Sequence, residues 1–231
     1  SDGSITAWGY SSYGGDDYYG NSLAPSGTGY TQIASTSSAF AALDVNGSIH
    51  PWGNTSEGGA TAFRGTGYLQ IVGTDEAFAA LRSDGTIKAW GDSNYGGSLA
   101  PSDGGYTQIF SNLRAFAALK SDGSITSWGN SSYGGSGAPS DDGYTQIFSN
   151  ENAFAALKSD GSITSWGYSS YGGSGAPTDN GYTQIFSTSE AFAALKSDGS
   201  ITAWGYSSYG GSGAPSDNGY TQIFSNRYAF A

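Results

Sequence analysis

Short segments of consecutive apolar residues recur along the chain, and polar, glycine-rich stretches separate them. Over residues 115–152, for example, the pattern predicts strands at 115–119, 125–128 and 144–148, with a turn at 120–124. Side chains of a strand alternate between two faces, and both faces of these strands carry apolar residues. A sheet with one solvated face would show polar residues at every second position. The pattern therefore predicts all-β sheets that are covered on both sides.

The pair Asp122-Gly123 stands at the centre of the predicted turn. This dipeptide is favoured in two-residue hairpin loops of type I′, in which both central residues need a positive φ. We therefore expect a tight antiparallel hairpin between the strands over 115–119 and 125–128.

The same pattern returns at an interval of 38 residues. Ala-Phe-Ala begins at Ala39, Ala77, Ala115, Ala153, Ala191 and Ala229, and Trp-Gly begins at Trp8, Trp52, Trp90, Trp128, Trp166 and Trp204. The first interval between Trp-Gly pairs is 44, because residues 16–21 are inserted after Gly15. A fixed period in this range is typical of solenoids and propellers.

The two ends of the chain favour a ring over an open solenoid. The chain starts within a repeat and stops at the third residue of another, so its end supplies the opening strand of a unit whose later strands lie at its beginning. A solenoid would need polar caps, whereas a ring leaves no long free edge. We therefore expect one domain over 1–231, a six-bladed β-propeller. Each 38-residue blade has three antiparallel strands, or three and a stub, and a composite blade joins 220–231 with 1–9.

Composition narrows the classes of partner. The net charge is −11, with only eight Lys and Arg residues, which argues against nucleic acid, since phosphate binding needs clustered cations. No Cys is present for disulfides or thiolate metal sites. No apolar run approaches the roughly 20 residues of a membrane span. There is also no Met, which suggests a processed or excised segment.

The stretch Ala-Leu-Lys-Ser-Asp-Gly-Ser-Ile-Thr-Ser-Trp-Gly over 118–129 resembles the regulator of chromosome condensation repeat, and similar stretches occur in every copy. The resemblance implies a β-propeller. The segment from Trp-Gly to Ala138-Pro139 is similar to the bacterial secreted branch that includes β-lactamase inhibitor protein II. That likeness implies a binding protein that works through its loops, extracellular or at the cell surface, as part of a larger bacterial protein.

A tyrosine-containing loop is the best candidate binding site. Ser-Ser-Tyr-Gly-Gly occurs at 11–15, 131–135, 169–173 and 207–211, with a variant at 93–97. Tyr among Ser and Gly is typical of binding loops, because it combines rigid amphipathic anchors with small adaptable residues. The candidate ligand-binding residues are Tyr13, Tyr95, Tyr133, Tyr171 and Tyr209, together with Tyr18 and Tyr19 of the insertion. In the alternative interpretation each Tyr only covers its own loop, and the repetition reflects duplication.

Other recurring residues have structural interpretations. The six Trp are expected to pack between blades rather than to stack on sugars. The recurring aspartates are explained by turn chemistry rather than by calcium, and no metal or cofactor is expected; they are Asp2, Asp84, Asp122, Asp160 and Asp198. A second acidic set is expected to be a solvated loop; it contains Asp141, Asp142, Asp179 and Asp217.

Catalysis finds little support. The chain has one His and neither a Cys nucleophile nor a phosphate loop. An enzyme would be centred on the divergent repeat over 39–76, with His50, Glu57, Phe63 and Arg64. We expect instead a monomeric, non-catalytic recognition module that binds a glycan or a protein. The alternative is a structural spacer in a large extracellular protein, or an engineered symmetric scaffold, with no ligand.

Overall fold

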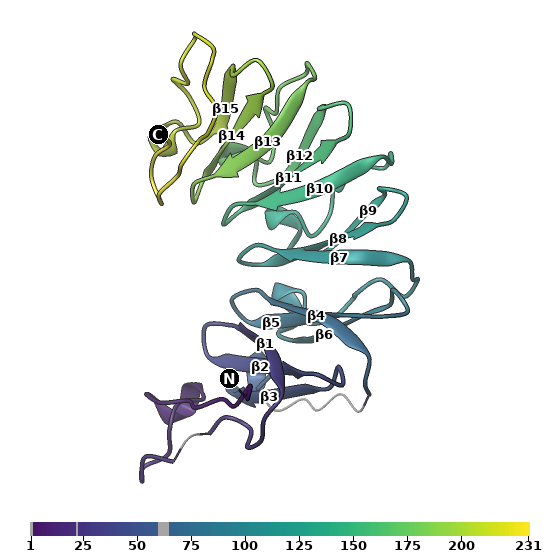
Figure 1. Ribbon diagram of the computed structural model, residues 1–231, viewed down its shortest axis with the longest axis vertical. Helices are drawn as coiled ribbons and strands as arrows, with labels where there is room; N and C mark the ends of the chain where they lie inside the picture. Colours follow the sequence, from purple (N-terminus) through teal and green to yellow (C-terminus); the bar gives the residue numbers. More distant parts are fainter. Residues whose placement is uncertain (1, 22, 60–64) are drawn as a thin grey trace. The chain divides into compact units, whose positions relative to one another are not determined.

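The chain forms five three-stranded antiparallel sheets joined by glycine-rich loops, as a propeller requires (Figure 1). The computed structural model describes residues 2–21, 23–59 and 65–231, and the chain divides into two compact units, 1–116 and 117–231. The strands are β1 (Tyr30–Ser35), β2 (Ala39–Asp44), β3 (Ile49–Gly53), β4 (Tyr68–Gly73), β5 (Ala77–Arg82), β6 (Ile87–Gly91), β7 (Tyr106–Ser111), β8 (Ala115–Lys120), β9 (Ile125–Gly129), β10 (Tyr144–Ser149), β11 (Ala153–Lys158), β12 (Ile163–Gly167), β13 (Tyr182–Ser187), β14 (Ala191–Lys196) and β15 (Ile201–Gly205). One 3-10 helix precedes each sheet or follows the last: η1 (Ser11–Tyr13), η2 (Thr55–Glu57), η3 (Ser93–Tyr95), η4 (Ser131–Tyr133), η5 (Ser169–Tyr171) and η6 (Ser207–Tyr209).

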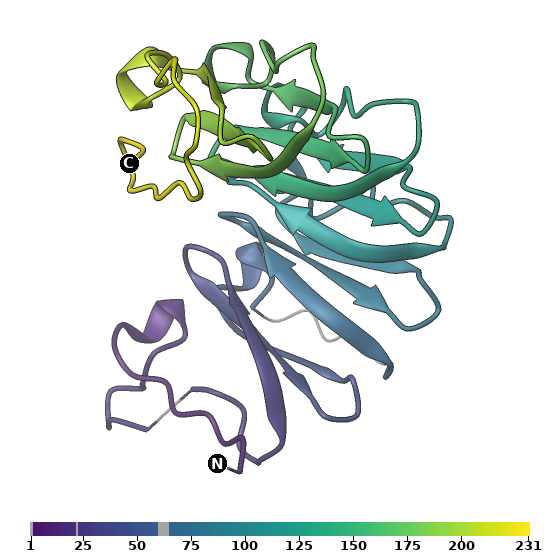
Figure 2. The same cartoon turned by 45° about the horizontal axis from the view of Figure 1, so that its top comes forward.

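Within each sheet the Ala-rich strand is central, as in the order β10–β11–β12 (Figure 2). The prediction of three strands per sheet is confirmed. The strand expected over 144–148 opens the next sheet rather than closing its own, since β10 pairs with β11, with Ile147 opposite Ala156. The loop between β9 and β10 is therefore the connection from one sheet to the next.

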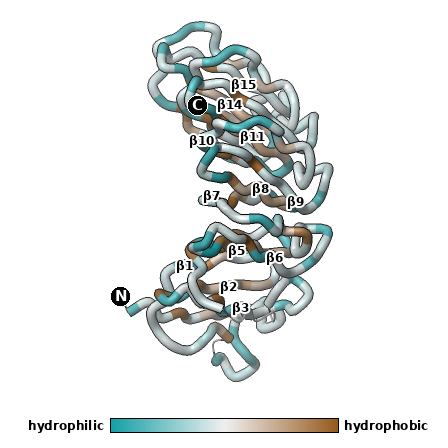
Figure 3. The backbone as a smooth tube through the Cα atoms, turned by 90° about the vertical axis from the view of Figure 1, so that its right-hand side faces the viewer, coloured by the Kyte–Doolittle hydropathy of each residue, from teal (hydrophilic) through white to brown (hydrophobic). Residues whose placement is uncertain are grey.

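The core lies along the central strands, where hydropathy is highest (Figure 3). In β11, residues 153–157 are all buried, so both faces of the sheet are covered. Phe154 and Trp166 on neighbouring strands stack with ring centres 5.3 Å apart and planes at 22°. Equivalent stacks occur at Phe40–Trp52, Phe78–Trp90 and Phe192–Trp204. The packing role expected of the tryptophans is confirmed for the five that are buried: Trp52, Trp90, Trp128, Trp166 and Trp204.

A glycine carbonyl fixes each loop on the following sheet. The indole N–H of Trp166 donates to the carbonyl of Gly134, 3.1 Å away. Gly134 has φ +92°, and a Cβ there would lie 2.9 Å from a ring carbon of Phe154, so neither the backbone nor the space accepts a side chain. The same bond joins Trp52 to Gly14, Trp90 to Gly58 and Trp204 to Gly172. The glycine thus seats the 3-10 helix against an aromatic stack.

The expectation of a type I′ turn at Asp122-Gly123 is wrong. Gly123 has φ +84°, but Leu99 is the one non-glycine residue with positive φ in the described ranges. Gly123 N donates to Lys120 O at 3.0 Å, and Lys120 N donates to Ser124 O at 2.9 Å. The hairpin is therefore a three-residue loop, with a turn followed by a left-handed glycine.

The aspartate of this loop has the structural role expected of it. Asp122 Oδ1 accepts hydrogen bonds from the backbone N–H (2.9 Å) and the hydroxyl (2.7 Å) of Ser124. This local bonding holds Asp122 in an ordinary backbone conformation and leaves the positive φ to glycine. Equivalent bonds occur at Asp2, Asp84, Asp160 and Asp198.

The segments of the predicted composite blade carry almost no strand structure. Residues 2–9 contain none, and 220–231 contain a single bridge, between Ser225 and Phe230. Trp8, unlike its five equivalents, is 79% exposed. Closure of the ring through these segments stays a prediction.

Each unit also has an apolar hollow next to its terminal segment. The hollow of the first unit, about 240 Å³, is lined by Ile5, Trp8, Ile33 and Phe40. That of the second, about 300 Å³, is lined by Ile201, Ile223 and Phe230 among others. Both hollows are lined in part by the segments expected to form the composite blade.

We predict that Trp166→Ala lowers the free energy of unfolding by about 3–5 kcal/mol, because it removes a buried ring and leaves a cavity. If the ring closes, Trp8→Ala lowers it by a similar amount, although Trp8 is the exposed member of the set. Denaturant unfolding followed by circular dichroism measures both. A neutral Trp8→Ala beside a destabilising Trp166→Ala would contradict closure.

Acid is predicted to destabilise the hairpins. Hydrogen bonds from Ser124, Ser162 and Ser200 lower the pKa of Asp122, Asp160 and Asp198 below 3.8. A lowered folded-state pKa gives stability that is complete above the unfolded value and disappears as the pH falls through the folded one. The melting temperature should therefore fall on acidification below about pH 4.

The matched variant is Asp→Asn at all three hairpins, which keeps the oxygen acceptor and removes the charge. Its melting temperature should depend less steeply on pH between about 4 and 2 than that of the parent. An unchanged slope would show that these carboxylates do not carry the acid sensitivity.

Candidate functional site

The candidate tyrosines lie at one end of each sheet, opposite the Asp-Gly hairpins. The carbonyl of Tyr171 accepts a hydrogen bond from Asn150 Nδ2 (2.6 Å), and that of Tyr209 accepts one from Thr188 Oγ1 (2.9 Å). Asn150 and Thr188 belong to the first connection of a sheet, between its first and central strands. These bonds tie each 3-10 helix to that connection, so the tyrosines and the connections form one edge.

Six tyrosine rings of the second unit form a continuous ladder along this edge. Neighbouring ring centres are 4.8–6.4 Å apart, within the range of favourable aromatic contacts. In order, the tyrosine ladder consists of Tyr133, Tyr168, Tyr171, Tyr206, Tyr209 and Tyr228. The structure thus brings together three of the candidates, Tyr133, Tyr171 and Tyr209, through three rings that the sequence analysis did not single out.

The missed residues Tyr168 and Tyr206 directly follow a Trp-Gly pair. In another copy this position holds Asn130, whose Oδ1 accepts from Ser132 N at 3.0 Å and so caps the 3-10 helix. Tyr168 and Tyr206 make no such capping bond, and their rings join the ladder instead. Alignment of the copies would have revealed this exchange of a capping residue for a ring.

The remaining candidates lie in the first unit. The ring of Tyr13 contacts that of Tyr10 at 5.0 Å. The guanidinium of Arg114 lies over Tyr95, 4.9 Å from its ring centre. In the second copy the tyrosine is replaced by Glu57, which accepts a hydrogen bond from Thr36 Oγ1 (3.1 Å). The tyrosine series is therefore not uniform in this unit.

The inserted loop holds Tyr18 and Tyr19 out in solvent, with 94% and 84% exposure. Their rings meet edge to face at 5.4 Å. Asp17 organises the loop, since its Oδ1 accepts from the backbone N–H groups of Tyr19 and Asn21 at 2.9 Å each. The side-chain amide of Asn21, which donates to Asp17 Oδ2 at 2.9 Å, lowers the pKa of Asp17 most, and the backbone bonds add to this shift.

Carboxylates of the first connections border the ladder. Burial, and then the nearby charge of Glu151, raise the pKa of Glu190, while Arg227 opposes the shift. Glu190 is also the main cause of the raised pKa of Tyr171. Arg227 lies 3.7 Å from Glu151 and over the ring of Tyr228, at 5.7 Å. Two carboxylates and one arginine thus border the ladder in this unit.

The opposite end of the sheets carries a structural set of charged residues. Asp141, expected in a solvated loop, is exposed but pairs with Lys158 and accepts a hydrogen bond from the Tyr144 hydroxyl (3.0 Å). Lys158 in turn lies over the Tyr144 ring, at 4.7 Å from its centre. Asp179, Lys196 and Tyr182 repeat this arrangement.

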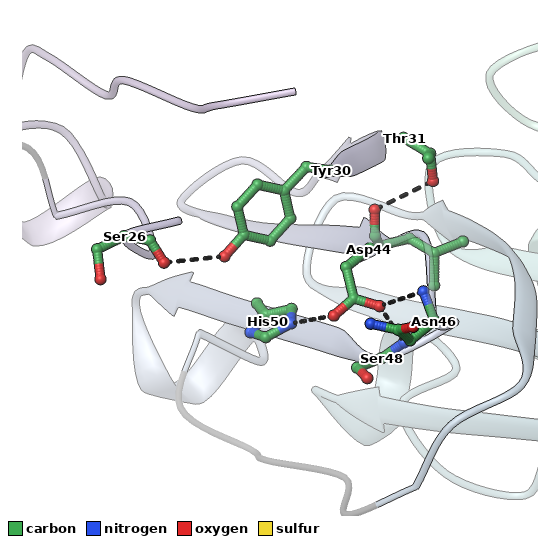
Figure 4. Close-up of polar contacts among 8 residues, drawn as sticks. Ser26, Tyr30, Thr31, Asp44, Asn46, Ser48 and His50 are labelled. Atoms are coloured by element: carbon green, nitrogen blue, oxygen red, sulfur yellow. Dashed lines mark hydrogen bonds and ion pairs between the residues drawn. The ribbon is translucent and has the colours of Figure 1, made fainter. Parts of the chain in front are cut away.

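The first sheet replaces this set with a histidine–aspartate pair. Asp44 stands at the position of Lys158, and its Oδ2 lies 3.0 Å from His50 Nε2 (Figure 4). The Tyr30 ring meets His50 edge to face at 5.3 Å. Asp44 Oδ1 also accepts from the backbone of Asn46 and Ser48, as turn aspartates do.

Two of the residues considered for an enzyme, His50 and Glu57, lie at opposite ends of the first sheet. His50 lies beside the hairpin, whereas Glu57 lies at the tyrosine end of the same region. Phe63 and Arg64 lie outside the described residues. Within the described ranges, no three His, Asp or Glu side chains gather as a metal site would require, and no helix has the length and apolar character to span a membrane.

No protein-family model matches the chain, and no curated protein matches it in sequence. Its fold is similar to that of solved propellers. The ectodomain of the moss Physcomitrella patens receptor kinase CR4 has a TM-score of 0.62 at 16% identity, over 86% of this chain and 59% of that one. Human WBSCR16 has a TM-score of 0.54 at 18% identity, over 87% and 70%.

Yeast RCC1 (Prp20), solved in complex with Kap60, has a TM-score of 0.53 at 17% identity, over 76% of this chain and 56% of that one. The chain thus spans less than two thirds of the moss and yeast proteins. These similarities show the fold alone. At that level they confirm the resemblance to the regulator of chromosome condensation propellers.

Proposed function

We propose that this chain is a non-catalytic recognition module that binds a glycan or protein partner along its tyrosine-bearing edge. Its loops would act as those of the bacterial secreted branch do, in an extracellular or cell-surface setting within a larger bacterial protein, and the module would act as a monomer. Exposed rings held by a rigid scaffold support this proposal, because binding residues often lie on loops that a stable framework positions.

The observation that carries the proposal is where the repeats differ. The copies over 115–152 and 153–190 differ at six positions. Four of the six belong to the tyrosine edge: the residue after Trp-Gly and the three residues of the first connection. The next copy, over 191–228, differs from its predecessor at all three positions of that connection. A spacer with no ligand gives no reason for differences to gather at this edge.

The chemistry of the edge fits recognition better than it fits reaction. Tyr10, Tyr168 and Tyr206 are 69%, 41% and 42% exposed, so each offers an aromatic face and a hydroxyl to solvent. Such side chains bury large areas at a small cost in conformational entropy.

We predict that replacing all five loop tyrosines by Ser (Tyr13, Tyr95, Tyr133, Tyr171 and Tyr209) abolishes binding, while a single replacement weakens it only slightly. Several equivalent weak contacts act together, so their combined affinity can exceed that of one by about 10²–10⁴. The measurement is binding of labelled protein to a glycan array, with and without calcium, and to a panel of bacterial and host surface proteins.

A matched control carries Ser→Ala at Ser121, Ser159 and Ser197, which are exposed at the hairpin end. This variant should bind as the parent does, and thermal unfolding should show that both variants are folded. Binding that survives loss of all five tyrosines would refute the proposal.

A further inference from the structure

Two carboxylates lie in the first connections beside the tyrosine ladder. Glu151 lies between β10 and β11, and Glu190 lies between β13 and β14. The backbone N–H of the ladder residue Tyr206 donates to the carbonyl of Glu190 at 2.9 Å, which holds this connection against the ladder. Ser189 Oγ donates to Glu151 Oε1 at 2.9 Å, so the two connections also contact each other.

The edge already binds cations supplied by the chain itself. Arg227 lies over the ring of Tyr228 and 3.7 Å from Glu151 Oε1. In the other unit, Arg114 lies 4.9 Å from the ring centre of Tyr95. Aromatic faces attract guanidinium groups, and a neighbouring carboxylate strengthens the attraction. The same pairing in both units shows which chemistry this edge accommodates.

The charges of the second unit leave the edge short of cations. Its basic residues are Lys120, Lys158, Lys196 and Arg227. The three lysines end central strands at the hairpin end, so Arg227 is the one basic residue of this unit that lies with Glu151 and Glu190 at the tyrosine edge. A neutral glycan would offer these carboxylates no opposite charge, whereas a basic polypeptide would.

We propose that the tyrosine ladder, with Glu151 and Glu190, binds an extended cationic segment of a partner protein, whose Arg or Lys side chains lie on the rings and pair with the two carboxylates. This inference rests on the proposed function, because it names the partner of the same edge. Successive rings 4.8–6.4 Å apart offer several adjacent faces to one extended segment.

The probe is a fluorescent oligo-arginine peptide, titrated with the protein at low and physiological salt and followed by anisotropy, with a Gly-Ser peptide of the same length as reference. We expect Glu151→Gln with Glu190→Gln, and separately Tyr168→Asn with Tyr206→Asn, to weaken binding by about tenfold, since each removes two of the direct contacts. Asn is the capping residue found at this position in another copy, so the second variant removes rings while supplying a helix cap.

The control for net charge is Asp142→Asn with Asp217→Asn, which removes one charge from the loop before β10 and one from the segment after η6. Asn already occupies the position of Asp142 in the two following copies. This control should bind within about twofold of the parent, because remote exposed charges are screened by salt.

The inference would be overturned if the Asp142/Asp217 variant lost as much affinity as the Glu151/Glu190 variant, or if oligo-arginine did not bind. Binding of a glycan that depends on the ladder tyrosines, without binding of oligo-arginine, would overturn it too, yet leave the proposed function intact.

Discussion

The structure depends on one repeated contact, in which a left-handed glycine presses on the Phe/Trp stack of the following sheet. The carbonyl oxygen of Gly134 accepts a hydrogen bond from the indole N–H of Trp166. A Cβ on Gly134 would collide with the ring of Phe154. A 3-10 helix ends at this glycine, so the contact fixes the helix and the Tyr133 that precedes it. The buried stack thus determines where the exposed ring lies, and stability and surface presentation share one anchor.

Because this contact fixes the loops at one end of each sheet, the two ends of the sheets differ in their side-chain contacts. At the hairpin end, polar groups satisfy one another: Asp122 bonds Ser124, and Lys158 pairs with Asp141. At the tyrosine end, rings contact rings, and burial together with the nearby charge of Glu151 raises the pKa of Glu190. The first end has its partners within the same sheet and the loops that adjoin it. The second presents aromatic faces and incompletely balanced charge, which is where the copies also differ in sequence.

The fold could be predicted from the sequence because its signals are local and repeated. The 38-residue period and the apolar runs gave the three strands of each sheet nearly to the residue. The type I′ turn was wrong because the Asp122 side chain bonds Ser124 and so favours a longer loop. Three ladder residues, Tyr168, Tyr206 and Tyr228, were missed because they lie outside the recurring Ser-Ser-Tyr-Gly-Gly motif, at positions where the copies differ. Two of the ladder contacts, Tyr133–Tyr168 and Tyr171–Tyr206, also join different repeats. For the same reason the sequence could locate the edge but not its charge.

The position after Trp-Gly has a consequence for how such a surface can change over time. Asn130 caps its helix there, whereas Tyr168 adds a ring, and the helix forms in both cases. The glycine and tryptophan that hold the loop are not the residue at this position. One substitution there can therefore alter the surface without disturbing the buried packing. The exposed residue of each copy can therefore change independently of the others. Duplication of a repeat followed by single substitutions can produce a new binding surface while the scaffold stays the same.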